Sequence, residues 1–313
     1  MNILLREHST AIHAPSSGES FLREQAELSR FNMLRLRPGL GEEASQSFLA
    51  YEARMLSLER HWIGETRRIL RPLLSRVPDT PDAFISWFEN LKISGPGQSD
   101  ALFPWLARDA SYEQMRWFLG QEIGGEAGFD DLVAMTQVKM PVAAKLEMAR
   151  NYWDEMGRGA CKGMHGPMLS ELARYFELDS APEDTVAESL ALGNMMIALA
   201  VNRRFAFQSA GALGVIEMTA PGRAAYVVQG LRRLGVPRKQ SHYFSLHAVL
   251  DKQHSAAWNE KVLRPLVAED PHRAVALAEG ALLRLWCGAR CFERYRQEFD
   301  LVQADREAMR ALS

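Results

Sequence analysis

Apolar residues that recur every three or four positions restrict the fold of this chain more than any other feature of its sequence. This spacing is typical of amphipathic helices, because a helix returns to the same face about every 3.6 residues. We find no convincing run of alternating, β-branched residues bounded by turns, which would indicate a strand. The sequence therefore predicts an all-α protein, built as a helical bundle.

Prolines and glycines divide the chain into the expected helices. The N-terminal part is expected to contain helices over 17–36 and 42–76, and a short helix that follows Pro81. Four of the later helices open with proline, which has no N–H to leave unpaired in a first turn. These later helices are expected over 111–138, 141–157, 163–178, 182–211, 222–234, 237–266 and 271–299.

The segment Lys92 to Asp100 has no helical periodicity and is the expected boundary between two parts of the chain. Residues 1–100 are expected to form an N-terminal helical layer. The long helix in this layer indicates a homodimer interface. Residues 101–313 are expected to form the main helical domain, which carries the functional residues.

Charge and cysteine content exclude several classes of partner. Lys and Arg number 37 and Asp and Glu 39, so the formal net charge is −2 and gives no basis for binding nucleic acid or an anionic membrane. The longest apolar stretches are too short to span a bilayer, and the first residues lack a secretory-signal pattern. The cysteines Cys161, Cys287 and Cys291 cannot all pair, so we expect free thiols in the cytoplasm.

Two histidines and an aspartate in HAVLDKQH are the strongest functional signal. At about 100° per residue, His247, Asp251 and His254 fall within roughly 60° of each other on one helix face. That face also carries Phe244 and Trp258, where polar groups without partners are costly. A metal ion would supply the partner, because neutral His and ionised Asp are good iron ligands. The alternative is two structural histidines that are hydrogen-bonded to the aspartate.

A helix break in NYWDEMGRGACKGMH separates Glu155 from His165. The break would let two side chains ten residues apart meet at one point, which a straight helix does not allow. The neighbouring Asp154 is expected to face solvent or to support a ligand. Without the metal, the segment is a helix–turn–helix with incidental polar residues.

Two further carboxylates are candidates for an inward position. Glu217 lies between two apolar residues, where a buried carboxylate without a partner is rare. Alternatively, it reaches solvent from a helix end. Glu122 and Glu126 lie one helical turn apart, and one of them is expected to point inward. Glu122 is preferred because it follows an aromatic stretch, and Glu126 is the second choice.

Together, these residues make three histidines and four carboxylates on five helical segments. Carboxylate-bridged di-iron bundles need such a set, with Glu and His side chains from different helices. Zinc does not need so many oxygen ligands. The excess of carboxylates and the absence of cysteine favour iron or manganese.

The pattern resembles the haem-oxygenase-like di-iron oxidases, also described as iron-containing redox enzymes. The resemblance covers about 111–266 and rests on FLGQE, NYWDEMGRG followed by His165, the isolated Glu217 and HAVLDKQH. It implies a haem-oxygenase-like bundle that holds two iron ions and uses O2. The ligands that it implies for one iron are Glu122, His165 and His254. Those implied for the other are Glu217, His247 and Asp251, with Glu155 in contact with both.

The ten-residue spacing of Glu155 and His165 is similar to that of the streptozotocin-pathway type of amine N-oxygenase. The resemblance therefore implies N-oxygenation of a small amine or amino acid derivative, with an external electron donor. Oxidative C–C cleavage, decarboxylation or desaturation of an amino or fatty acid is the alternative chemistry. Arg203 and Arg223 are candidates for binding a substrate carboxylate, because guanidinium binds it bidentately. Tyr226 is a candidate wall of the pocket.

Three other functions remain open on a similar bundle. A non-catalytic binding protein would be expected to have lost at least one of the seven ligands, and none is lost. A haem-binding oxygenase would need space for a porphyrin, which seven convergent ligands would fill. A hydrolase would need a nucleophilic cysteine, and Cys161 lies in the turn between Glu155 and His165 without a recognisable base.

Overall fold

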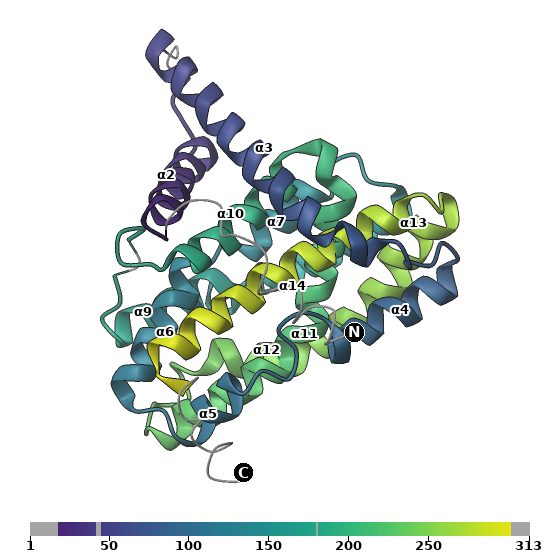
Figure 1. The fold of residues 1–313 in the computed structure, drawn as a ribbon. Helices are drawn as coiled ribbons and strands as arrows, with labels where there is room; N and C mark the ends of the chain where they lie inside the picture. Colours follow the sequence, from purple (N-terminus) through teal and green to yellow (C-terminus); the bar gives the residue numbers. More distant parts are fainter. Residues whose placement is uncertain (1–17, 42–44, 180, 302–313) are drawn as a thin grey trace, which may run out of the picture.

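The computed structural model describes residues 18–41, 45–179 and 181–301 (Figure 1). Within these ranges the chain forms helices and no β-strand, so the predicted all-α fold is confirmed. None of the helices in these ranges combines the length and the apolar character that crossing a membrane requires. The α-helices are α2 (Gly18–Leu36), α3 (Gln46–Leu74), α4 (Pro81–Ser94), α5 (Leu102–Arg108), α6 (Tyr112–Gly124), α7 (Phe129–Thr136), α8 (Val142–Glu155), α9 (His165–Tyr175), α10 (Ala187–Val201), α11 (Ala206–Arg233), α12 (His242–Trp258), α13 (Arg264–Glu269) and α14 (Arg273–Glu298).

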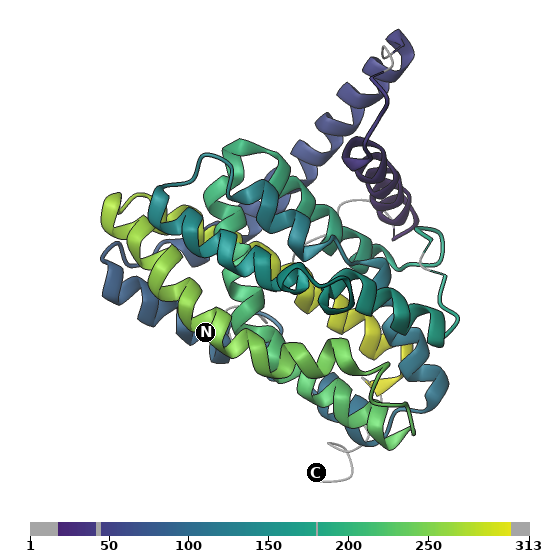
Figure 2. The same cartoon turned by 180° about the vertical axis from the view of Figure 1, so that it is seen from behind.

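Helix α11 is the central helix of the bundle, and it packs along both α12 and α14 (Figures 1 and 2). Glycines allow a close approach of α11 and α14. A Cβ on Gly211 would lie 1.9 Å from the Leu277 carbonyl oxygen, and one on Gly280 would lie 1.7 Å from the Gln208 carbonyl oxygen. No side chain fits at either position. This close packing brings residues of α11 and α14 to a common interior.

Helix α2 and the first half of α3 project from the bundle (Figures 1 and 2). Helix α2 is attached to α10 by buried polar contacts, in which the Asn32 side chain donates to Asn194 at 2.7 Å. The second half of α3 packs on α14. Helix α4 packs against α11 and α13, and its Phe84 and Phe88 share one buried core with Trp258 of α12. The division at Lys92 to Asp100 stays a prediction.

Two helix breaks differ from those expected around Glu217. The expected helices 182–211 and 222–234 are replaced by α10 and a continuous α11, which runs through Pro221. Proline removes one hydrogen bond to the residue four positions earlier, but packing on both sides keeps α11 helical. The break lies instead at Asn202, whose side chain accepts a hydrogen bond from the Arg204 N–H at 3.1 Å. Glu217 therefore lies inside a helix and not at its end.

Two other expected helices are also interrupted. The helix expected over 111–138 divides into α6 and α7, because Gly128 adopts a positive φ of 73°. The Glu126 carboxylate accepts hydrogen bonds from the N–H groups of Ala127 and Gly128 at this turn. The helix expected over 237–266 contains a π-helical turn at Asn259–Leu263, between α12 and α13. Glycine and polar side chains at these points outweigh helical periodicity.

Candidate metal centre

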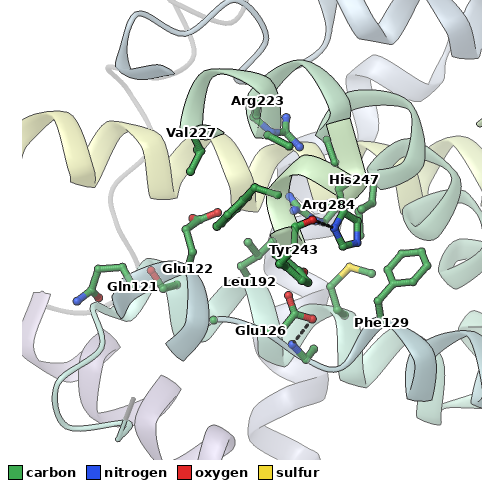
Figure 3. A pocket seen from close by; sticks show the side chains of 18 of the residues that line it. Gln121, Glu122, Glu126, Phe129, Leu192, Arg223, Val227, Tyr243, His247 and Arg284 are labelled. Atoms are coloured by element: carbon green, nitrogen blue, oxygen red, sulfur yellow. Dashed lines mark hydrogen bonds between the residues drawn. The ribbon is translucent and has the colours of Figure 1, made fainter. Parts of the chain in front are cut away.

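A cavity of about 170 Å³ lies inside the bundle (Figure 3). It is lined by side chains from α5, α6, α7, α8, α10, α11, α12 and α14. Most of the lining is aliphatic or aromatic, as in other small-molecule pockets. The predicted metal ligands that line the cavity are Glu122, Glu155, Glu217, His247 and Asp251. His165 and His254 lie beside this lining, in the two groups described next.

The first group consists of Glu155, His165 and His247. One ligand atom from each residue lies within 4.8 Å of the others. His247 Nδ1 donates to the Tyr243 carbonyl oxygen at 2.7 Å, which leaves Nε2 without a proton. His165 Nδ1 lies 2.5 Å from Glu155 Oε2, but the two atoms are not oriented for a hydrogen bond. The group thus presents imidazole nitrogens and a carboxylate to one point.

The second group consists of Glu155, Glu217 and His254, again with one ligand atom of each within 4.8 Å of the others. Asn151, one helical turn before Glu155, donates to Glu217 Oε1 at 2.6 Å. His254 Nε2 donates to Asp154 Oδ2 at 3.1 Å. The other nitrogen, Nδ1, is 3.6 Å from Glu217 Oε1 and has no hydrogen bond. His254 therefore has one nitrogen free to bind a cation.

Glu155 belongs to both groups, and the backbone after it explains how it meets His165. Helix α8 ends at Glu155, and Gly157 follows with a φ of 60°. A Cβ on Gly157 would lie 2.3 Å from the carbonyl carbon of Gly163. Only glycine allows this close return of the chain, which starts α9 at His165. The expected convergence across the GRG break is present.

Three predicted or alternative ligands lie outside the two groups. Glu122, which the resemblance implies as an iron ligand, is in neither group, and it accepts a hydrogen bond from the Tyr295 hydroxyl at 3.1 Å. The Glu126 carboxylate accepts hydrogen bonds from backbone N–H groups in the turn before α7. Asp251 is buried one helical turn after His247 and lines the cavity, but it is in neither group.

Residues 116–289 match the model of the iron-containing redox enzyme family. The matched stretch is more than half of the 313-residue chain and contains all seven predicted ligands. The chain belongs to the iron-containing redox enzyme family. The predicted membership and the haem-oxygenase-like all-α fold are therefore confirmed, and the chain is an oxidoreductase. No curated protein matches it.

The carboxyl groups of this redox enzyme are buried and lie close together, and both features raise their pKa values. Burial, and then the nearby Glu217 carboxylate, raise the pKa of Glu155 to about 9. Burial also raises the pKa of Asp251 to about 10, with further contributions from Glu217 and Glu155. Burial alone would lower the pKa of His254, but the carboxylates around it raise that pKa to about 9. Protons compensate the charge here, and a divalent cation would replace them.

The donor atoms fit an iron site. Ten buried polar side-chain atoms of the described residues have no hydrogen-bond partner, and three of them are His165 Nδ1, His254 Nδ1 and Asp251 Oδ1. Such atoms are rare in folded proteins and need an explanation. All three belong to the ligand set that the sequence predicts. A set of carboxylate oxygens and imidazole nitrogens, without sulfur, suits iron or manganese.

Several functional residues carry only weak signals in the sequence. Asn151 is an ordinary polar residue in an amphipathic helix, and its role depends on where Glu217 lies. Tyr243 and Tyr295 look like aromatic core residues. Arg284 lies in the cavity lining and interrupts the apolar run ALLRLWC. This interruption was a usable signal, but it lies beyond the region of the resemblance.

The three predicted substrate residues are placed differently. Arg223 lines the cavity. Arg203 does not line it, because its guanidinium donates to carbonyl oxygens at the end of α7, including that of Met135 at 2.9 Å. Tyr226 is exposed and outside the cavity lining. Of the three, only Arg223 is in the lining of this cavity, and a role of Arg203 or Tyr226 in substrate binding stays a prediction.

Proposed function

We propose that this protein is a di-iron oxygenase that uses O2 to oxidise a small metabolite. The observation that carries the proposal is that Glu155 belongs to two separate groups of Glu and His ligand atoms. A carboxylate has two oxygens, so one side chain is able to contact two metal ions. The proposed ligands are Glu155, His165, Glu217, His247 and His254, with Asp251 beside them.

Iron bound here would supply the redox chemistry that activates O2, and the chain's own residues prepare the site for it. The Tyr243 carbonyl fixes His247 with Nε2 toward the group, and Asp154 similarly orients His254. The carboxylates balance the charge of the ions. The apolar lining limits the access of water, which strengthens electrostatic interactions at the site.

The proposed reaction is N-oxygenation of an amine or amino acid derivative. Support comes from the spacing of Glu155 and His165, which resembles that of amine N-oxygenases. One oxygen atom of O2 enters the new N–O bond, and the other leaves as water. An external donor supplies the two electrons, and two protons complete the balance. We place the reaction in the cytoplasm, in the biosynthesis of a small molecule.

Iron binding tests the proposal directly. Metal-free protein is titrated anaerobically with Fe(II), and bound iron is measured after gel filtration. We expect two equivalents per chain, and O2 uptake that depends on iron and increases with an oxidisable amine. Glu155→Gln is expected to lose most of the iron binding and most of the iron-dependent O2 uptake. Glu147→Gln is the matched control, because Glu147 lies two turns earlier on α8 and outside the cavity. One equivalent or none in the unaltered protein would refute the di-iron site.

We also propose that the protein is a homodimer. Helix α2 and the projecting half of α3 carry exposed apolar side chains, among them Met33, Leu34, Leu49 and Leu56. A second copy would bury them. Light scattering coupled to gel filtration measures the mass. A monomer at micromolar concentration contradicts the proposal.

A further inference from the structure

Two arginines enter the cavity from neighbouring helices. Arg223 comes from α11 and Arg284 from α14, and both line the same cavity as the proposed iron ligands. Figure 3 shows Arg284 between Glu122 and His247, and Arg223 above it in this view. Both side chains are partly buried. Two guanidinium groups inside a mostly apolar cavity need an explanation, because each keeps its positive charge.

Neither arginine forms an ion pair with the protein. Among the described residues, no carboxylate oxygen lies within 4.0 Å of the Arg223 or Arg284 guanidinium, and the cavity carboxylate Glu122 acts on both only from a longer distance. Arg223 donates to Thr219 Oγ1 at 3.0 Å, and its guanidinium lies 5.5 Å from the centre of the Phe292 ring. Arg284 Nε is buried and has no hydrogen-bond partner. Several N–H groups therefore remain available.

Burial and mutual repulsion both act on the two guanidinium groups in this cavity. Burial, and then the positive charge of Arg284, lower the pKa of Arg223 to about 9. Glu122 opposes this effect, but its carboxylate is hydrogen-bonded to Tyr295 and forms no ion pair. A buried cation without a counter-ion is costly, and an anion bound between the two guanidinium groups would offset that cost.

We propose that Arg223 and Arg284 bind the carboxylate of the substrate, which is a small organic acid. This inference rests on the proposed function, because it names the substrate class of the same site. Guanidinium groups bind a planar carboxylate through paired hydrogen bonds. The remaining part of the substrate extends along the apolar lining toward Glu155 and Glu217.

The size of the cavity limits the substrate. A cavity of about 150 Å³ holds a molecule as large as benzene. This cavity has about 170 Å³, so it fits roughly six to eight non-hydrogen atoms on the same scale. A short amino acid or carboxylic acid has this size, whereas a long-chain fatty acid exceeds it. The substrate class is therefore a short carboxylic acid, which includes amino acids.

Calorimetric titration with hexanoate, 1-hexanol and inorganic phosphate tests this inference on the full chain, as metal-free and as Mn(II)-loaded protein. Hexanoate is expected to bind about 10-fold more tightly than the alcohol, because charge-assisted hydrogen bonds are strong. Arg223→Gln and Arg284→Gln are expected to remove this preference. Arg232→Gln is the control, because Arg232 is exposed on the same helix.

Three results would overturn the inference: equal binding of hexanoate and hexanol, an unchanged preference in both cavity variants, or phosphate binding as tight as that of hexanoate. Circular dichroism checks that each variant folds, and Arg223→Lys replaces Arg223→Gln if the latter does not. Binding to the metal-free protein requires neither iron nor O2. Failure here is therefore distinct from failure of the Fe(II) titration.

Discussion

Asp154 shows how a residue outside the ligand groups is expected to control metal affinity. Its carboxylate accepts the Nε2 proton of His254 and also pairs with Arg158, which lies at the surface. Partners of this kind hold a ligand histidine in one tautomer and one orientation. The sequence predicts that Asp154 faces solvent or supports a ligand, and the structure gives it this contact with His254.

We expect Asp154→Asn to weaken metal binding by about 10-fold or more, because the amide no longer favours the orientation of His254 with Nδ1 toward the metal. The apparent affinity for Mn(II) or anaerobic Fe(II) measures the effect. Asp130→Asn is the control for a nearby loss of charge, because Asp130 acts electrostatically on Glu155 and His165 but is in neither ligand group. Equal affinities of Asp154→Asn and the unaltered protein would show that the contact has no role in metal binding.

The resemblance and the structure give different roles to the Glu122 carboxylate. The resemblance implies that Glu122 is an iron ligand, whereas the structure holds its carboxylate on Tyr295. We therefore expect Glu122→Gln to keep two equivalents of Fe(II), because the amide oxygen still accepts the Tyr295 hydroxyl. Iron content after anaerobic loading decides between the two. Loss of one equivalent in Glu122→Gln, with Glu126→Gln unaffected, would favour the resemblance.

At this scale the sequence predicts which residues meet better than it predicts how they pair. Helical spacing alone places His247, Asp251 and His254 near one face. The division into groups depends on how α12 packs against α8 and α11, and no local pattern contains that information. His247 consequently joins His165, and His254 joins Glu217.

Among the helices, the break between α8 and α9 has the most direct effect on the site. The segment runs from Glu155 through Gly157 to His165 in about ten residues, and it contains the antiparallel bridge between Met156 and Met164. The sequence predicts this break because GRG cannot continue a helix easily. Pro221 shows the opposite case, since α11 continues through a residue that usually ends helices.

Gly157→Ala is expected to destabilise the protein by more than about 1 kcal/mol, because alanine is strained at positive φ. It would also push His165 away from Glu155, since its Cβ would overlap the Gly163 backbone. Thermal unfolding and bound iron measure the two effects. The control is Gly166→Ala in α9, where an added Cβ meets nothing within 4 Å. If Gly157→Ala melts at the same temperature as Gly166→Ala, the turn is not required.

The bundle as a whole was predictable as a class, because helical periodicity extends over most of the chain. The position of each helix in the bundle was less predictable from the sequence. The glycines of α11 and α14 that allow close packing look ordinary in the sequence. The need for them is visible only in the structure, where the backbone of Gly280 packs directly against that of Gln208. The buried Asn32 and Asn194 pair likewise joins helices that are far apart in the chain.

The buried acids are expected to make the stability of the whole molecule depend on metal and pH. In the metal-free chain, Glu155 and Asp251 have pKa values of about 9 and about 10, well above those of an unfolded chain. At a pH between the unfolded and the folded pKa values of these two groups, the folded state therefore binds more protons than the unfolded state. His254, with a pKa raised to about 9, acts in the same direction above pH 6.5. Stability should then decrease as pH rises from about 6.5 to 9.

Bound Mn(II) should reverse most of this loss, because the cations compensate the ionised carboxylates in place of protons. Melting temperatures of metal-free and Mn(II)-loaded protein, taken from pH 6.5 to 9, measure the difference, which is expected to widen with pH. Each titrating group contributes at most about 1.4 kcal/mol per pH unit. In Glu155→Gln the metal-free protein should depend less steeply on pH, since an amide does not ionise. A metal-free melting temperature that rises across this range would mean that the carboxylates are already ionised and paired inside the fold, and a cation would then have no protons to displace.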